Sequence, residues 1–388
     1  MKICFICQNL FTLGGVQRVV TTILNELSKE ENMELYVIMP YHQEENKLFS
    51  LSEKIEIINS NSLNKKISYL SKLILAVNKR FQFLNNYLLK NIADKLIIHP
   101  MTKENYINKI NDLKVDAVIA TGDYGSLLLA SISERLNCKT IGWQHSTFDG
   151  YFKSRGHSSY GLSLVYKKYL NKLDKVIVLT KADKNCYDSY FDIDSVVLHN
   201  PINLKFSNVS NLNNKNILFV GRFNIKVKGI DYLIKIMRKV FEKDKEIKLI
   251  MVGDGDDKYK IENLIKRNGL ENNIILEGTT TDIEKYYLNS DVTVSTSRWE
   301  GFGMVIVESM ACGVPVVCFD NYGPNEIISD GENGYLIPKF NIDEFANKLI
   351  KLMNCYEERE KMGKAARRRA RDFYLNEILE QLKCIITQ

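Results

Sequence analysis

Short apolar runs rich in β-branched residues alternate along the chain with stretches whose apolar residues recur every three or four positions. The first pattern is typical of buried strands and the second of amphipathic helices, so their alternation indicates a parallel sheet covered by helices. The predicted fold class is therefore α/β. Strands are predicted at residues 2–7, 34–39, 54–58, 116–121, 139–143 and 175–180, and then at 216–220, 247–252, 273–277, 291–295 and 314–319.

The alternation breaks near residues 199–215, where a proline follows Asn200 and the polar stretch SNVSNLNNKN precedes the next strand. A length of 388 residues also favours two domains. We therefore predict two doubly wound units, residues 1–199 and 200–371, followed by a helical segment at 372–388. Ligands of such open sheets bind where the strands end at their carboxyl edge. The residues that follow each strand are thus the candidates for function.

Composition narrows the class of protein. Apolar residues make up 45% of the chain and charged residues 26%, as in ordinary globular proteins. No uncharged apolar run approaches the roughly 18 residues of a membrane-spanning helix. The start, MKICFICQNL, has too short an apolar run for a signal peptide, so we expect a cytoplasmic protein. The eight cysteines include one C-x-x-C but no second ligand pair, which argues against a zinc site.

The net charge of +6 is concentrated in part at residues 61–90, which contain lysines and an arginine but no acidic residue. Apolar residues in this segment lie three or four apart, so it is predicted as a basic amphipathic helix. Two interpretations remain open: the helix lies on an anionic membrane surface, or it belongs to the domain and exposes its basic face to water. No motif of nucleic-acid-binding proteins accompanies the charge, so no nucleic-acid partner is predicted.

Glycines and cations follow the first strand of each half. Gly14 and Gly15 stand at the predicted start of a helix, where backbone N–H groups can approach a phosphate closely. Arg222 and Lys228 flank the loop GRFNIKVKGID after the strand at 216–220. Two cations at this position could neutralise a diphosphate without a metal ion. Each feature alone also fits an ordinary strand-to-helix loop.

The most informative segment is EGFGMVIVESMACG at residues 300–313. Glu300 precedes a Gly-Phe-Gly turn at the carboxyl edge of the sheet, and a helix is predicted to begin near Gly303 or Met304. Glu308 lies within the first turns of that helix, on an otherwise apolar face, where a carboxylate is costly unless it meets hydroxyls or a cation. A polyhydroxylated ligand meets this need, because each carboxylate can accept hydrogen bonds from two hydroxyls.

These residues resemble the E-x7-E motif of family 4 retaining glycosyltransferases, which have the GT-B fold. The resemblance extends to GGVQRVV, GRFNIKVKG, LEGTTTDIEKYYLNSDVTVSTSRWEGFG and FDNYGPNEIISDGENGYLI. It implies two Rossmann-like domains that face a cleft: an acceptor-side domain at 1–199 and a donor domain at 200–371. It also implies that the helix at 372–388 crosses back to the first domain.

The resemblance implies a role for each matching position. Glu300 would contact hydroxyls of the donor sugar, Glu308 the ribose, and Arg222 with Lys228 the departing phosphate. His145, in WQHST, would line the cleft opposite the donor sugar. The catalytic residues implied are His145, Arg222, Lys228 and Glu300, and the donor-binding residues are Gly14, Gly15, Arg222, Lys228, Thr279, Thr280, Glu300, Gly301, Phe302, Gly303, Met304 and Glu308.

The implied reaction moves a hexose or N-acetylhexosamine from a UDP-sugar to a lipid-linked glycan acceptor. The product would be part of a bacterial surface polysaccharide such as a capsule. No D-x-D pair stands at a strand end, and the acids of DGDD are placed in a turn away from the other site residues, so we predict neither a metal nor a cofactor. Alternatives are a sugar-nucleotide epimerase or a glycan phosphorylase of the same architecture, or a silent partner subunit that binds a nucleotide sugar or glycan. The sequence names neither the sugar nor the acceptor.

Overall fold

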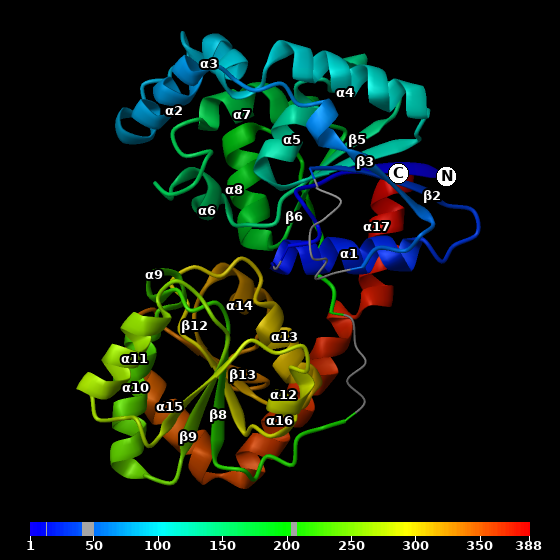
Figure 1. The fold of residues 1–388 in the computed structure, drawn as a ribbon. Helices are drawn as coiled ribbons and strands as arrows, with labels where there is room; N and C mark the ends of the chain where they lie inside the picture. Colours follow the sequence, from blue (N-terminus) through cyan, green and yellow to red (C-terminus); the bar gives the residue numbers. More distant parts are fainter. Residues whose placement is uncertain (13, 41–49, 203–207) are drawn as a thin grey trace. The chain divides into compact units, whose positions relative to one another are not determined.

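The computed structural model describes residues 1–388 except 13, 41–49 and 203–207. Its chain divides into two compact units. The first comprises Met1–Asn200 together with Ile378–Gln388, and the second comprises Pro201–Glu377. Each unit is an open parallel sheet with helices packed on it (Figure 1).

The first unit contains a seven-stranded parallel sheet with the order β3-β2-β1-β4-β5-β6-β7. The order runs outward in both directions from β1 and β4, which pair in register from Ile3 with Ala117 to Ile6 with Ala120. Reversal of the order at this pair is the mark of a doubly wound sheet. The strands are β1 (Lys2–Ile6), β2 (Glu34–Met39), β3 (Ile55–Asn59), β4 (Ala117–Thr121), β5 (Lys139–Trp143), β6 (Lys175–Val178) and β7 (Val196–Val197).

The second unit contains a six-stranded parallel sheet with the order β10-β9-β8-β11-β12-β13. Here the order reverses between β8 and β11, which pair at Val292 with Ile217 and at Thr293 with Leu218. The strands are β8 (Asn216–Val220), β9 (Lys248–Val252), β10 (Ile274–Gly278), β11 (Val292–Ser295), β12 (Val316–Phe319) and β13 (Gly334–Ile337). The sequence prediction missed β7, which has only two residues, and β13, a four-residue strand.

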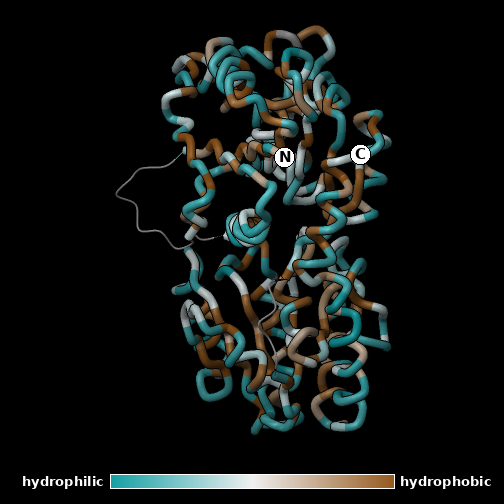
Figure 2. The backbone as a smooth tube through the Cα atoms, turned by 90° about the vertical axis from the view of Figure 1, so that its right-hand side faces the viewer, coloured by the Kyte–Doolittle hydropathy of each residue, from teal (hydrophilic) through white to brown (hydrophobic). Residues whose placement is uncertain are grey.

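Helices cover the faces of both sheets (Figure 1). In the first unit they are α1 (Gly15–Leu27), α2 (Tyr69–Phe81), α3 (Lys90–Ile97), α4 (Pro100–Leu113), α5 (Gly122–Ala130), α6 (Phe148–Phe152), α7 (Ser163–Tyr169) and α8 (Lys181–Phe191), with single 3-10 turns η1 (Ser60–Ser62), η2 (Ser133–Arg135) and η3 (Leu170–Lys172). In the second unit they are α9 (Ile225–Lys228), α10 (Ile230–Lys243), α11 (Lys258–Arg267), α12 (Glu284–Leu288), α13 (Met304–Ala311), α14 (Tyr322–Ile327), α15 (Ile342–Asn354), α16 (Tyr356–Ala370) and η4 (Arg371–Phe373). Brown apolar and teal polar stretches alternate along the coils of the helices (Figure 2).

The last helix, α17 (Leu375–Thr387), returns the chain to the first unit. Lys139 at the start of β5 donates a hydrogen bond of 2.8 Å from its ammonium to the carbonyl of Ile385. Lys383 forms an ion pair with Glu30, which follows α1. Ile378 and Leu382 are fully buried. Packing and polar contacts therefore both tie this helix to the first sheet, as the crossing helix was predicted to be.

The basic segment at 61–90 differs from its prediction. Only Tyr69–Phe81 is helical, as α2, because Gln82 adopts a left-handed conformation that ends the helix. Ser68 begins it by accepting a hydrogen bond from the backbone of Ser71. Among the described residues, no helix is long and apolar enough to cross a bilayer. The eight cysteines are all free, and those of the predicted strand, Cys4 and Cys7, are buried.

Candidate functional site

The site begins at the reversal point of the second sheet. Because β8 and β11 are neighbours, the segments that leave their carboxyl ends lie next to each other. The segment after β8 contains Arg222 and ends in the short helix α9, whose last residue is Lys228. The segment after β11 leads through Glu300 to α13. The fold thus brings together two loops that are more than 70 residues apart in sequence.

An ion pair joins these two loops. The Lys228 ammonium lies 2.7 Å from the Glu300 carboxylate, and the side chains are only 21% and 14% exposed. The Ser297 hydroxyl donates a second hydrogen bond of 3.1 Å to the same carboxylate oxygen. The Thr296 hydroxyl donates to the Lys228 carbonyl at 3.0 Å, which holds the two backbones together. The cation and the carboxylate predicted from sequence are therefore adjacent.

Gly229 makes this close approach of the loops feasible. Its φ of +62° is in the left-handed region, and a Cβ at this position would lie 2.0 Å from the Thr296 carbonyl oxygen. A side chain would therefore push Lys228 away from the loop that contains Glu300. Glycine is needed here both for its conformation and for its lack of volume.

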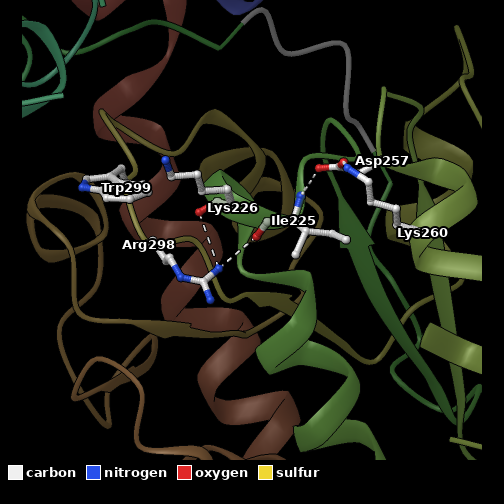
Figure 3. A pocket seen from close by; sticks show the side chains of 6 residues that line it. All are labelled: Ile225, Lys226, Asp257, Lys260, Arg298 and Trp299. Carbon is white, nitrogen blue, oxygen red and sulfur yellow. Dashed lines mark hydrogen bonds and ion pairs between the residues drawn. The ribbon is translucent and has the colours of Figure 1, made fainter. Parts of the chain in front are cut away.

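Arg298 anchors the Glu300 loop, and sequence analysis did not identify it. Its guanidinium donates to both carboxylate oxygens of Asp231, at 2.9 and 2.6 Å, and to the carbonyl of Ile225 at 2.9 Å. It also lies over the Tyr232 ring, 4.3 Å from the centroid. Figure 3 shows Arg298 reaching the backbone of α9 beside a hollow of about 490 Å³. The contact with Asp231 raises the pKa of the Arg298 guanidinium, so the anchor stays charged.

The turn that contains DGDD corrects one sequence expectation. It was placed away from the site, but the Asp257 carboxylate accepts a hydrogen bond of 3.0 Å from the backbone N–H of Ile225, at the start of α9 (Figure 3). The backbone N–H of Phe223 also donates to the carbonyl of Asp254 at 2.8 Å. This turn therefore supports the segment that contains Lys228. Among the described residues, no group of three or more His, Cys, Asp or Glu side chains could hold a metal ion.

The second glutamate of the motif lies inside α13. Glu308 is buried, with 3% of its surface exposed, and accepts a hydrogen bond of 3.0 Å from the Tyr287 hydroxyl. The helix begins at Met304, after Gly303 with a φ of +102°, as the sequence predicted. Its first backbone N–H groups have no partner within the helix, and their partial positive charge favours an anion. Phe302, in the same turn, is buried and packs edge-on against Phe373.

The other residues predicted for donor binding occupy different places. Arg222 is exposed and forms no ion pair with any described residue. Thr279 and Thr280 are exposed directly after β10, at the same carboxyl edge of the second sheet. Gly14 precedes the first residue of α1, Gly15, in the first unit.

His145 follows β5 in the first unit and is held in an apolar setting. Its ring lies 4.7 Å from the Trp143 ring, and neither ring nitrogen has a hydrogen-bond partner among the described residues. Burial lowers the pKa of His145 to about 3; the Asn200 side chain opposes this shift but is not in hydrogen-bonding geometry. The imidazole is therefore neutral near pH 7 and can accept or donate one hydrogen bond.

Comparison with known proteins identifies related chains. Residues 202–369 match the family model described as "Glycosyl transferases group 1". An uncharacterized glycosyltransferase of Haemophilus influenzae is 27% identical over 99% of both chains. The poly(ribitol-phosphate) alpha-N-acetylglucosaminyltransferase of Staphylococcus aureus is 29% identical over 83% of this chain, but the match spans only 63% of that relative's length.

A solved structure has the same architecture. A variant of TarM from S. aureus, crystallised with fondaparinux, alpha-GlcNAc-glycerol and UDP, aligns over all of both chains with a TM-score of 0.74 and 20% identity. At this identity the likeness shows the fold alone. The fold is GT-B, built from two Rossmann-like parallel-sheet domains.

Proposed function

We propose that the chain is a member of the group 1 family of glycosyl transferases, whose model matches residues 202–369, and that it transfers a hexose or N-acetylhexosamine from a UDP-sugar to a glycan. We place it among the family 4 enzymes, which retain the configuration of the anomeric carbon. The observation that carries the proposal is the Lys228–Glu300 pair, held beside the start of α13 where β8 and β11 end. It places a cation, a carboxylate and free backbone N–H groups at one edge of a sheet.

Each of these groups suits one part of a sugar nucleotide. Lys228 and the exposed Arg222 supply positive charge for the diphosphate, and the backbone N–H groups of Gly303 and Met304 add donors. Glu300 can accept hydrogen bonds from hydroxyls of the donor sugar once Lys228 turns to the phosphate. Glu308 can do the same for the ribose. Residues Thr279 and Thr280 are assigned to the base through main-chain groups.

The first unit supplies the remaining proposed contacts. We assign backbone contacts with the donor to Gly14 and Gly15, at the start of α1. Among the described residues, nothing lies within 4 Å of a Cβ built on Gly15, whereas a Cβ on Gly14 would lie 2.1 Å from the side-chain oxygen of Gln17. His145 is neutral near pH 7 and is therefore suited to a hydrogen bond with a sugar hydroxyl rather than to charge stabilisation.

The proposed reaction needs no metal ion and no covalent intermediate. The acceptor hydroxyl oxygen forms a bond to the anomeric carbon on the face from which the diphosphate departs, and the bond from that carbon to the phosphate oxygen breaks. The departing phosphate takes the acceptor proton. Lys228, Arg222 and the start of α13 stabilise the developing charge, as fixed donors do in other anion-stabilising sites. Nucleophilic attack by a carboxylate, as in retaining hydrolases, has no role here.

We propose a glycan acceptor of a bacterial surface polysaccharide, lipid-linked, with the protein at the cytoplasmic face of the membrane. Support comes from the similarity to the S. aureus poly(ribitol-phosphate) alpha-N-acetylglucosaminyltransferase and from the UDP bound in the crystal structure of the TarM variant. The segment at 61–90 is proposed to meet an anionic membrane surface.

A panel of sugar nucleotides tests the proposal. Purified protein is mixed with each donor and with a lipid-linked glycan acceptor, and free UDP is measured. We expect acceptor-dependent release of UDP from at least one UDP-hexose or UDP-N-acetylhexosamine. Glu300→Gln should lower this release about 10- to 100-fold, whereas the matched control Glu242→Gln, on the exposed side of α10, should leave it unchanged. Conversion of the donor to an epimer without release of UDP, or binding without turnover, would instead identify the epimerase or the silent subunit.

A further inference from the structure

Most apolar residues of helix α2 face outward, although Ile74 and Leu75 are partly buried against the core. Its buried residues are Ser71 and Asn78. A helix on a soluble domain normally buries its apolar residues, because exposing apolar side chains to water costs free energy. The exposed apolar residues of α2 are Tyr69 at 83%, Leu70 at 63%, Leu73 at 51%, Val77 at 42% and Phe81 at 68%.

Hydrogen bonds fix this orientation. The Asn78 amide donates to the carbonyl of Gly161 at 3.0 Å, and its side-chain oxygen accepts from the backbone N–H of Leu84 at 2.8 Å. Turning the helix over would bury the apolar residues but would leave Asn78 and its partners unpaired. The helix is therefore held with its apolar stripe outward, and this is not a consequence of loose packing.

The exposed apolar surface continues beyond α2 to α3, its neighbour at the margin of the first unit (Figure 1). The further exposed residues are Phe83 at 39%, Tyr87 at 67%, Leu88 at 85% and Ile92 at 55%. Exposed apolar side chains gathered on neighbouring elements in this way indicate a contact with a membrane or another protein.

Charge favours the membrane. A hollow of about 520 Å³ at the end of α2 is lined by Lys79, Arg80 and Arg155, with Ala76 and Phe81. None of the three cations forms an ion pair with a described residue. Lys79 and Arg80 also suit the negative end of the helix dipole, but Arg155 comes from a separate loop, which the dipole does not explain. All charged residues of 61–90 are cations, which an anionic surface complements.

We infer that this hollow binds the phosphate of an anionic phospholipid while the apolar stripe of α2 enters the boundary between head groups and acyl chains. The inference deepens the proposed membrane contact by giving it a phosphate site and an orientation. A lipid phosphate bound by three cations fixes the position of the first unit along the surface. The apolar stripe supplies binding that is insensitive to salt, and the cations supply the part that salt weakens.

Vesicle co-sedimentation tests this inference independently of catalysis. We expect the intact chain to bind vesicles of phosphatidylglycerol and phosphatidylcholine, and to bind pure phosphatidylcholine much more weakly. Arg155→Gln should weaken binding to the anionic vesicles about fivefold, the usual effect of one basic residue near a charged bilayer. Leu73→Ser should weaken it about tenfold. The matched control Arg238→Gln, an exposed arginine of α10, should have no effect.

Two further arms separate the alternatives. Inorganic phosphate at millimolar concentration should compete little, because it lacks the apolar part of the ligand. Transfer to a water-soluble acceptor should be unchanged in Arg155→Gln, so failure of the lipid site and failure of the proposed enzyme are distinguishable. Equal binding to neutral and anionic vesicles would overturn the inference. The inference would also be overturned if the chain forms a dimer and Leu73→Ser abolishes the dimer but leaves vesicle binding unchanged.

Discussion

Lys228 and Glu300 are predicted to act on the substrate as well as on each other, and a double-mutant cycle can separate these two roles. The side chains are 21% and 14% exposed, between a surface ion pair and a buried one. Among the described residues, Lys228→Met leaves the Glu300 carboxylate with only the 3.1 Å hydrogen bond from Ser297. We therefore expect a loss of about 2 kcal/mol in unfolding free energy, between the values for exposed and buried pairs.

The effect on catalysis should be larger than the effect on stability. If Lys228 stabilises the departing diphosphate, Lys228→Met should lower kcat by about 10²- to 10³-fold. Glu300→Gln keeps its shape but loses charge-assisted hydrogen bonds, so about a 10- to 100-fold loss is expected. In the variant with both substitutions no unpaired charge remains. Its stability should recover by about 1 kcal/mol, whereas its activity should stay at or below that of either single variant.

Thermal unfolding and acceptor-dependent release of UDP, measured on the same preparations, provide the comparison. The matched control is Lys239→Met with Asp343→Asn, an exposed ion pair of 2.8 Å that should affect both quantities little. Recovery of activity together with stability in the Lys228→Met, Glu300→Gln variant would refute the reasoning, because the pair would then be only structural.

Three other outcomes follow from the same geometry. The pKa of His145 is about 3 in the folded chain and near 6.5 in the unfolded chain, so the unfolded state binds more protons between these pH values. The free energy of unfolding should therefore fall by up to about 1.4 kcal/mol per pH unit as the pH drops through this range. Chemical unfolding at several pH values should show that His145→Gln removes this dependence. Arg298→Lys keeps the charge but cannot bind both carboxylate oxygens of Asp231, so the KM for the donor should rise several-fold while kcat changes less. An unchanged KM in steady-state kinetics would argue against a role of Arg298 in anchoring the Glu300 loop. Incubation with EDTA should leave the rate of UDP release unchanged, and loss of activity that Mg²⁺ or Mn²⁺ restores would contradict the metal-free mechanism.

The sequence predicted the architecture well because strands and helices leave different periodic patterns. It also predicted that Lys228 and Glu300 would meet at one edge, since both follow strands of the same parallel sheet. Their separation of 2.7 Å could not be predicted, because it depends on α9, a single turn whose four residues have no recognisable period. Arg298 was missed because its partner Asp231 lies in the first turn of α10, 67 residues earlier in the sequence, and only the fold brings the two together.

Two further differences have identifiable physical causes. The turn with DGDD was placed away from the site because its acids look like ordinary turn residues, whereas Asp257 in fact binds the first backbone N–H of α9. The apolar spacing at 61–90 indicated a stripe, but spacing does not say which side of a helix faces the core. The hydrogen bonds of Asn78 with Gly161 and Leu84 decide that for α2.

The central claim is that Arg222, Lys228 and the start of α13 bind the diphosphate of a nucleotide sugar while Glu308 binds its ribose. A crystal structure of the chain with UDP tests this most directly. The account predicts phosphate oxygens within about 3.2 Å of the Lys228 ammonium and of the backbone N–H of Met304, with the ribose hydroxyls on Glu308. UDP bound at any other place, or a ribose that does not touch Glu308, would contradict it.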